Sequence, residues 1–321
     1  MKVLYIANNQ TNDFLSDAVF HGLHDIQSVE VIDSNRLWYM YNSVQKSSLV
    51  NRFHGRGFTY YADVEEKVIN REGIDKKIFD RYFDRIIYGN VARCRDYLSE
   101  VLSNYPKENI IFLDGEDEHN RPGINSQFVN LGKYYRRELS IKESEIYPQV
   151  KPISFAYPEN KMPNSVSQKQ KLLAQVIPGV PETFVFDNED SYFEDYRISM
   201  FAYTWRKAGW DCLRHYEILG NGCVPLFLDI ESCPTTICTT IPKDKLINFY
   251  KASGIYDLFD MSSPAEYDDR RAIVTNKDLT KINDLKLNDE FFTLYFTALD
   301  DLMKYNRESI TTKKLAEYVL S

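Results

Sequence analysis

The chain has 321 residues and a formal net charge of −8, with 43% hydrophobic and 14% aromatic residues. This length suits two α/β domains better than one ordinary core, and the composition is that of a globular protein. The acidic balance disfavours a nucleic-acid partner, although it leaves room for a local basic cleft. The 23 tyrosines suit surfaces that are half apolar and half hydrogen-bonding, such as sugar-binding clefts.

Signals for secretion and membrane insertion are not found in the sequence. The apolar run at residues 3–7 is too short for a signal peptide, and no stretch approaches the ~20 apolar residues of a spanning helix. We therefore expect a soluble, cytoplasmic protein with no membrane span. Its cysteines are Cys94, Cys212, Cys223, Cys233 and Cys238. Their spacing is wrong for a zinc site, so buried, reduced thiols are expected.

The first half of the chain alternates apolar runs with helical patterns, which is typical of a parallel sheet. Strands are predicted at residues 3–7, 28–32, 84–88 and 109–113. Helices are predicted from a cap at Asn12 or Asp13 to about His24, and over residues 91–102. An aromatic insertion at residues 37–74 interrupts this pattern, and such long loops often carry binding residues.

A second alternating set is predicted from about residue 151. Its expected strands are 152–156, 183–186, 200–204 and 224–228, and its expected helices are 189–196, 211–220 and a long one from about 289. We therefore expect an α/β protein with two Rossmann-like domains, residues 1–150 and 151–321. The terminal helices are expected to pack back against the first domain.

The segment from Trp205 to Lys243 carries the densest functional pattern. A predicted strand ends just before it, and a loop leads into a predicted helix, whose first backbone N–H groups can hold a diphosphate. Arg206 and Lys207 lie in that loop, where they can neutralise phosphate charge. Arg214 and Glu217 are three residues apart and share a helix face.

The same segment resembles known glycosyltransferases. Glu217-Ile-Leu-Gly-Asn-Gly-Cys-Val-Pro225 resembles the E-x-L-x-x-G-x-x-P pattern in the donor domain of GT-B enzymes. The longer string, with Cys233-Pro-Thr-Thr236 and Pro242-Lys243, resembles uncharacterised exostosin- and CgeB-like glycosyltransferases. The likeness covers most of the chain to about residue 250, with first-half blocks at residues 16–23, 55–58, 112–117 and 134–139.

This resemblance implies a GT-B fold, with the two domains facing each other across a cleft, and a nucleotide-sugar donor site in the second domain. Glu217 would contact ribose or sugar hydroxyls. The expected donor-binding residues are Trp205, Arg206, Lys207, Trp210, Asp211, Arg214 and Glu217. Two alternatives stay open: Asp211 serves only the helix macrodipole, and Arg214 only pairs with a neighbouring acid. His215 is interpreted as a core histidine.

An acidic cluster follows the strand predicted at residues 109–113. Asp114, Glu116 and Asp117 lie at its carboxyl end, where open α/β sheets bind ligands, and a carboxylate there can serve as general base. The alternative is a turn with a capping Asp. Asn8, Asn9 and Asp13, after the first strand, are candidate acceptor-binding residues, with helix capping as the alternative.

The expected activity is transfer of a sugar from a nucleotide-diphosphate sugar, a UDP-sugar first of all, to a hydroxyl acceptor. That acceptor is a glycan, a small molecule or a modified nucleobase. No metal and no cofactor are expected, because a helix start and basic side chains would stabilise the leaving diphosphate in place of a metal, and the acidic cluster lacks the D-x-D motif of the other transferase fold. The alternative is a non-catalytic GT-B scaffold that binds a nucleotide or a glycan. A Rossmann oxidoreductase is disfavoured because residues 7–10, after the first strand, contain no glycine.

Overall fold

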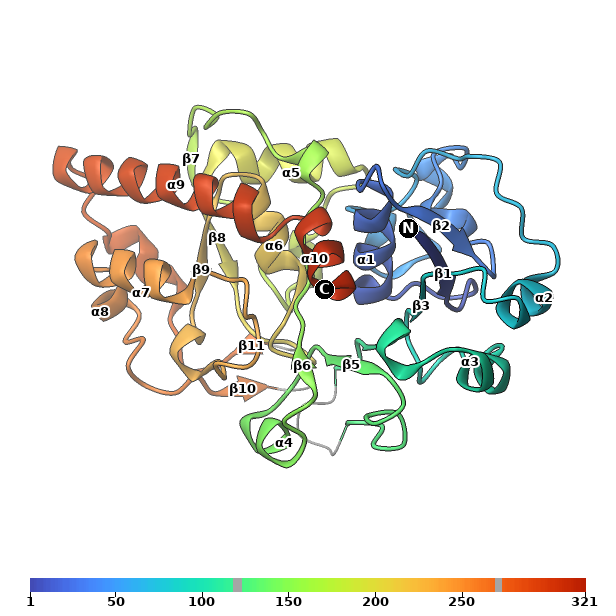
Figure 1. Ribbon diagram of the computed structural model, residues 1–321. Coiled ribbons are helices and arrows are strands. Elements are labelled where there is room, and N and C mark those ends of the chain that lie inside the picture. The colour runs from blue at the N-terminus through green and yellow to red at the C-terminus, as the bar shows by residue number, and fades with distance from the viewer. Residues whose placement is uncertain (118–122, 269–272) are drawn as a thin grey trace. The chain divides into compact units, whose positions relative to one another are not determined.

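The structure is a computed structural model that describes residues 1–117, 123–268 and 273–321. The chain divides into two compact units (Figure 1). Unit 1 comprises Met1–Pro158 and Thr311–Ser321, and unit 2 comprises Glu159–Ile310. Unit 1 is thus built from two separate stretches of the sequence, because the last helix returns to it.

Unit 1 contains a six-stranded, entirely parallel sheet in the order β2-β1-β3-β4-β5-β6. The strands are β1 (Lys2–Ile6), β2 (Glu30–Asp33), β3 (Arg85–Tyr88), β4 (Ile110–Asp114), β5 (Lys133–Arg136) and β6 (Lys151–Pro152). This parallel α/β architecture is Rossmann-like, as predicted. The strand order reverses between β1 and β3, and such a switch point is where open α/β sheets bind ligands.

Two strands at one side of this sheet differ from the prediction. β5 was not expected, because Lys133 and Arg136 flank only two apolar residues. The strand predicted at 152–156 is wrong: only Lys151–Pro152 forms a strand, and it pairs with β5 instead of opening a second sheet. Proline lacks the N–H that a central strand must donate, which is consistent with the position of β6 at the sheet edge.

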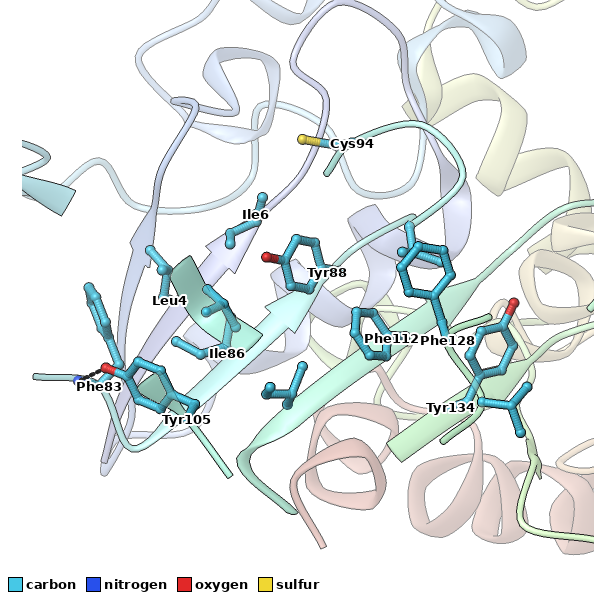
Figure 2. Close-up of a cluster of buried hydrophobic side chains, with 14 of the residues drawn as sticks. Leu4, Ile6, Phe83, Ile86, Tyr88, Cys94, Tyr105, Phe112, Phe128 and Tyr134 are labelled. Carbon is cyan, nitrogen blue, oxygen red and sulfur yellow. Dashed lines mark hydrogen bonds between the residues drawn. The ribbon is translucent and has the colours of Figure 1, made fainter. Parts of the chain in front are cut away.

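The core of unit 1 is formed by side chains from several neighbouring strands (Figure 2). The rings of Tyr88 on β3 and Phe112 on β4 stack with centroids 5.3 Å apart, and Phe128 packs on Phe112 at 5.2 Å. Tyr105 has its hydroxyl 3.1 Å from the Phe83 N–H, from which it accepts a hydrogen bond. Burial of each large side chain contributes about 1.5–3 kcal/mol, so this cluster fixes the strand positions.

The helices of unit 1 are α1 (Phe14–His24), α2 (Ile74–Phe79), α3 (Leu98–Asn104), α4 (Ile141–Ile146) and α10 (Thr312–Leu320). Short 3-10 turns cover Trp38–Met40, Lys46–Ser48, His54–Gly57 and Lys107–Asn109. The helix predicted at 91–102 is wrong in its first half. The chain forms turns there, and Tyr97 adopts a left-handed conformation with φ of 56°, so α3 begins only at Leu98.

The aromatic insertion after β2 is largely buried. Tyr39 and Tyr61 donate hydrogen bonds from their hydroxyls to the Asp17 carboxylate on α1, at 3.2 and 2.9 Å. Burial raises the pKa of Asp17, and these two donors partly offset that cost. These tyrosines therefore support α1 from inside the unit instead of forming an exposed binding loop.

Helix α10 packs along α1 (Figure 1). Gly22 lies so close to α10 that a Cβ atom there would be 1.8 Å from the Thr312 carbonyl oxygen. His21, next to it, has Nδ1 3.1 Å from the Thr312 hydroxyl and Nε2 2.9 Å from the Asp63 carboxylate. A bridge between Tyr157 and Thr311 adds a backbone connection.

Unit 2 contains a three-stranded parallel sheet in the order β7-β8-β9 and an antiparallel pair, β10-β11. The strands are β7 (Lys171–Leu173), β8 (Ser199–Thr204), β9 (Val224–Phe227), β10 (Tyr267–Asp268) and β11 (Ile273–Val274). The helices are α5 (Glu189–Ile198), α6 (Leu213–Gly220), α7 (Lys243–Ala252), α8 (Ile255–Leu258) and α9 (Asp289–Ser309). Further 3-10 turns cover Glu159–Lys161, Pro181–Thr183, Ile230–Ser232 and Leu279–Asp284.

The predictions for β8, β9 and α5 are confirmed to within two residues at their starts and ends, and the predicted start of α9 is confirmed as well. The strand predicted at 183–186 is wrong, since a 3-10 turn at Pro181–Thr183 precedes it and Val185 is exposed. β7, which was not predicted, pairs with β8 in the parallel sheet. No helix among the described residues is both long enough and apolar enough to cross a membrane.

Candidate functional site

Three polar side chains meet at the carboxyl ends of β1, β3 and β4. Asp13 precedes α1, Asn90 follows β3 and Glu116 follows β4. The Asn90 amide donates to Asp13 Oδ2 at 2.6 Å and to Glu116 Oε1 at 2.9 Å. The Asn90–Asp13 bond spans the β1/β3 switch point, the position at which such sheets bind ligands. Two residues predicted separately, one for acceptor binding and one for catalysis, therefore share one cluster.

Two glycines allow this convergence. Gly89 and Gly115 each follow a strand directly, and each precedes a residue of the cluster. A Cβ on Gly89 would lie 2.2 Å from Ser16 Oγ, and a Cβ on Gly115 would lie 3.0 Å from Asp13 Oδ1. The strand–Gly–polar order thus lets the first turn of α1 lie against the strand ends.

Arg93 completes the cluster. Its Nε donates to Glu116 Oε1 at 2.7 Å, and its guanidinium is 3.7 Å from Asp13 Oδ2. Burial raises the pKa of Glu116, but the hydrogen bonds from Arg93 and Asn90 outweigh that effect and hold it below its usual value. Glu116 is 35% exposed, and its Oε2 accepts no hydrogen bond from the described residues. Glu116 is therefore an anchored, ionised carboxylate with one open oxygen.

The other two predicted catalytic acids lie outside this cluster. Asp114 is buried, accepts a hydrogen bond from the Tyr134 hydroxyl at 2.6 Å and pairs with Arg136 on β5. Burial raises the pKa of Asp114, against the opposing charge of Arg136. Asp117 is exposed and pairs with Arg137, which also bonds to the Gly115 carbonyl at 3.0 Å. These ion pairs tie the end of β4 to β5.

Asn8 and Asn9 contact Gln10 at the end of β1, and the Asn9 amide also donates to the Arg36 carbonyl at 3.4 Å. Asn8 Oδ1 accepts the Gln10 N–H at 2.7 Å, and Asn9 Oδ1 accepts the Gln10 amide at 2.8 Å. Asp13 Oδ1 caps α1 by accepting the N–H groups of Leu15 and Ser16, each at 3.1 Å. Asp13 is therefore a helix cap and a member of the cluster at once.

In unit 2, the loop at residues 205–212 connects β8 to α6. Trp205 and Trp210 are buried, whereas Lys207 is exposed. Asp211 is turned inward: its Oδ1 accepts the Tyr216 hydroxyl at 2.6 Å and lies 3.5 Å from Cys238 Sγ. Since Asp211 bonds inward, α6 begins at Leu213 instead of at 211, after Cys212, which makes no side-chain capping hydrogen bond.

Arg206 lies between aromatic rings. Its guanidinium is 4.1 Å from the Tyr267 ring centroid and 5.4 Å from that of Trp210. The backbone N–H of Arg206 donates a hydrogen bond to Asp229 Oδ2 at 3.2 Å. Burial raises the pKa of Asp229 to about 7. Asp229 was not predicted, and the available signal was an acid directly after a buried strand. Asn90 and Arg93 were not predicted either. In the sequence each is an ordinary polar residue, and only the folded sheet places them beside Asp13 and Glu116.

The two remaining donor candidates differ in their surroundings. Glu217 is buried, and its Oε2 accepts the Tyr192 hydroxyl at 2.7 Å. Arg214 makes neither a hydrogen bond nor an ion pair with the described part of the chain, and its Nε is shielded from solvent. Arg214 therefore forms no direct ion pair with a neighbouring acid, although the charge of Glu217 still acts on it. His215 is buried, as interpreted from the sequence.

Across the described ranges, no group of three or more His, Cys, Asp or Glu side chains is arranged to hold a metal ion. The five cysteines are free thiols, and four of them are buried. No family model, no curated protein and no solved structure matches the chain. The cluster in unit 1 and the start of α6 in unit 2 are therefore interpreted from the chemistry of their own residues.

Proposed function

We propose that this chain is a metal-independent glycosyltransferase that moves a sugar from a nucleotide-diphosphate sugar to a hydroxyl acceptor. The observation that carries the proposal is Arg214 at the start of α6. The Arg214 side chain is half-buried and its guanidinium has no acceptor among the described residues, which costs folding free energy that an anionic ligand on its accessible part would offset. The first turn of α6 adds backbone N–H groups that no side chain caps. Together they would hold a diphosphate.

The neighbouring residues fit the other parts of such a donor. Arg206 and Lys207 lie in the loop directly before α6 and would add positive charge beside the phosphates. Glu217, held by Tyr192, would accept hydrogen bonds from ribose or sugar hydroxyls. When the bond from the anomeric carbon to the phosphate oxygen breaks, the leaving diphosphate gains negative charge. Fixed cations and helix N–H groups stabilise that charge without reorganisation.

The cluster in unit 1 would bind the acceptor. Glu116 Oε2 would take the proton of the acceptor hydroxyl as its oxygen bonds to the anomeric carbon, and the nucleoside diphosphate would leave. Asn90 and Arg93 hold Glu116 Oε1, which leaves the second oxygen for this role. The proposal includes the GT-B arrangement of two domains, with the donor on the second.

A nucleotide- or glycan-binding scaffold without catalysis is the second candidate. It is favoured by the ion pairs of Asp114 with Arg136 and of Asp117 with Arg137, which occupy two of the three acids that the sequence suggested for catalysis. A scaffold would bind a nucleotide sugar and leave it intact.

Glu116→Gln tests the catalytic role directly. We expect the rate of nucleoside diphosphate release, measured across nucleotide sugars and a panel of hydroxyl acceptors, to fall by about 100-fold or more, because a general base is lost. Donor binding should stay unchanged. Asp117→Asn is the matched control, since it removes a neighbouring carboxylate outside the cluster, and it should keep most of the activity.

Three outcomes separate the candidates. If Glu116→Gln loses nucleoside diphosphate release while Asp117→Asn keeps it, the transferase is supported. Equal rates in wild type and Glu116→Gln exclude Glu116 as the base. Binding of a nucleotide sugar without release by the wild type, for every acceptor tried, favours the scaffold.

A further inference from the structure

His215 connects three elements of unit 2 from a fully buried position on α6. Its ring stacks on Phe227 of β9, with centroids 4.2 Å apart. Its Nδ1 lies 2.7 Å from the hydroxyl of Thr204, the last residue of β8. Its Nε2 lies 2.9 Å from the backbone carbonyl oxygen of Trp210, in the loop at residues 205–212.

These partners define one tautomer. A carbonyl oxygen only accepts hydrogen bonds, so Nε2 carries the proton and donates to Trp210. Nδ1 then accepts from the Thr204 hydroxyl. Burial lowers the pKa of His215 to about 3, so the imidazole is neutral at physiological pH. Both ring nitrogens are therefore satisfied only when the loop lies where it does.

The loop is also held at its other side. The Arg206 N–H donates to Asp229 beyond β9, and the Lys207 N–H donates to the Gly209 carbonyl at 3.0 Å, which closes the turn. Only residues 207 and 208 of the loop are exposed. His215 supplies a direct bond from the interior of α6 to the second half of the loop.

We propose that His215 is a positioning residue for the anion-binding loop at residues 205–212, acting through the Trp210 carbonyl and without touching the ligand. The identity of the ligand rests on the proposed function, whereas the positioning itself does not. A loop that is ordered before binding loses less conformational entropy when the ligand arrives, and this raises affinity. The role also explains why a neutral histidine is needed here, because it donates at one end and accepts at the other.

Two amide variants separate the two bonds of His215. A glutamine amide reaches the position of Nε2, so His215→Gln keeps a donor for the Trp210 carbonyl. An asparagine amide reaches only the position of Nδ1, so His215→Asn keeps the contact with Thr204 and loses the one with Trp210. Both variants leave Phe227 without its stacking partner, so the loss of packing is matched.

Amide hydrogen exchange of the ligand-free protein measures the effect. We expect exchange over residues 205–212 to rise about tenfold in His215→Asn, the equivalent of one hydrogen bond, and to change little in His215→Gln. Strands β8 and β9 should keep their protection in both. Equal exchange of the loop in the two variants would overturn the proposal. If only the His215→Gln variant folds, rapid exchange of the loop in that variant would also overturn the proposal.

A second measurement keeps the two proposals distinguishable. Titration with UDP, GDP and their hexose conjugates should show affinity about tenfold weaker in His215→Asn and near wild type in His215→Gln, because one hydrogen bond is lost. If the loop responds as expected but the wild type binds none of these nucleotides, the positioning role stands and the proposed donor site fails.

Discussion

Asp229 is a buried carboxyl group whose two oxygens have unequal surroundings. Oδ2 accepts hydrogen bonds from the Arg206 N–H and the Tyr267 hydroxyl. Oδ1 is shielded from solvent and has no hydrogen-bond partner among the described residues. Burial raises the pKa of Asp229 to about 7, so its ionisation opposes folding. This residue ties the end of β9 to the loop at residues 205–212 at a cost in stability near neutral pH.

The sign of the Asp229 effect follows from its two pKa values. The folded protein binds this proton more tightly than the unfolded chain, whose value is near 3.8. The stabilisation from the bound proton is therefore complete below about pH 4, and it is lost as pH rises to 7, by at most about 1.4 kcal/mol per pH unit. Asp229→Asn does not titrate, so its free energy of unfolding should rise relative to wild type over that range. Urea unfolding at several pH values measures this, with the exposed Asp300→Asn as control, and a pH-independent difference would contradict it.

Only some residues of the unit 1 cluster could be predicted from the sequence. Asp13 and Glu116 were recognisable, because each follows a predicted strand of a parallel sheet. Their meeting was not, because it depends on Asn90 and on two glycines that permit close approach. Asn90 lies between β3 and the residues predicted as a helix from Val91, and it was not singled out from the sequence.

At the scale of elements, the fully buried strands were predicted best. β1, β3, β4 and β8 each contain a continuous run of buried apolar residues, flanked by polar residues at one or both ends, and the run of β9 is interrupted only by Pro225. The errors arise where polar residues decide the local structure. The start of α6 shifted because Asp211 bonds to Tyr216, and α3 starts late because Tyr97 is left-handed.

The close contact between α1 and α10 predicts how a substitution at Gly22 changes the stability of the protein. Gly22→Ala would place a Cβ atom 1.8 Å from the Thr312 carbonyl oxygen, a backbone atom that cannot rotate away. We expect destabilisation of about 1–3 kcal/mol or more from overpacking, together with faster hydrogen exchange across α10. Gly254→Ala is the control, since a Cβ there meets nothing within 4 Å and adds only the strain of its φ of 77°. Unchanged protection of α10 in Gly22→Ala would contradict this packing.

The whole molecule has a chain path that the sequence did not predict in full. The apolar pattern indicated alternating strands and helices in both halves, but it carried no signal that β6 would join the first sheet. The return of α10 to unit 1 rests on Gly22 and on the buried Thr312, which are separated by almost the whole chain. Contacts of such long sequence separation leave no periodic trace in a single sequence.

We propose that the start of α6 holds the diphosphate of a nucleotide sugar. Isothermal titration of UDP- and GDP-sugars into wild type, Arg214→Met and the control Lys251→Met tests it most directly. Lys251 is an exposed cation on α7, so its loss matches the change in net charge. We predict that at least one nucleotide sugar binds wild type and Lys251→Met alike. It should bind Arg214→Met about tenfold more weakly or worse, because a charge-assisted hydrogen bond contributes about 1.5–3 kcal/mol. Wild type that binds none of these ligands, or an Arg214→Met variant that binds as wild type does, would contradict the account.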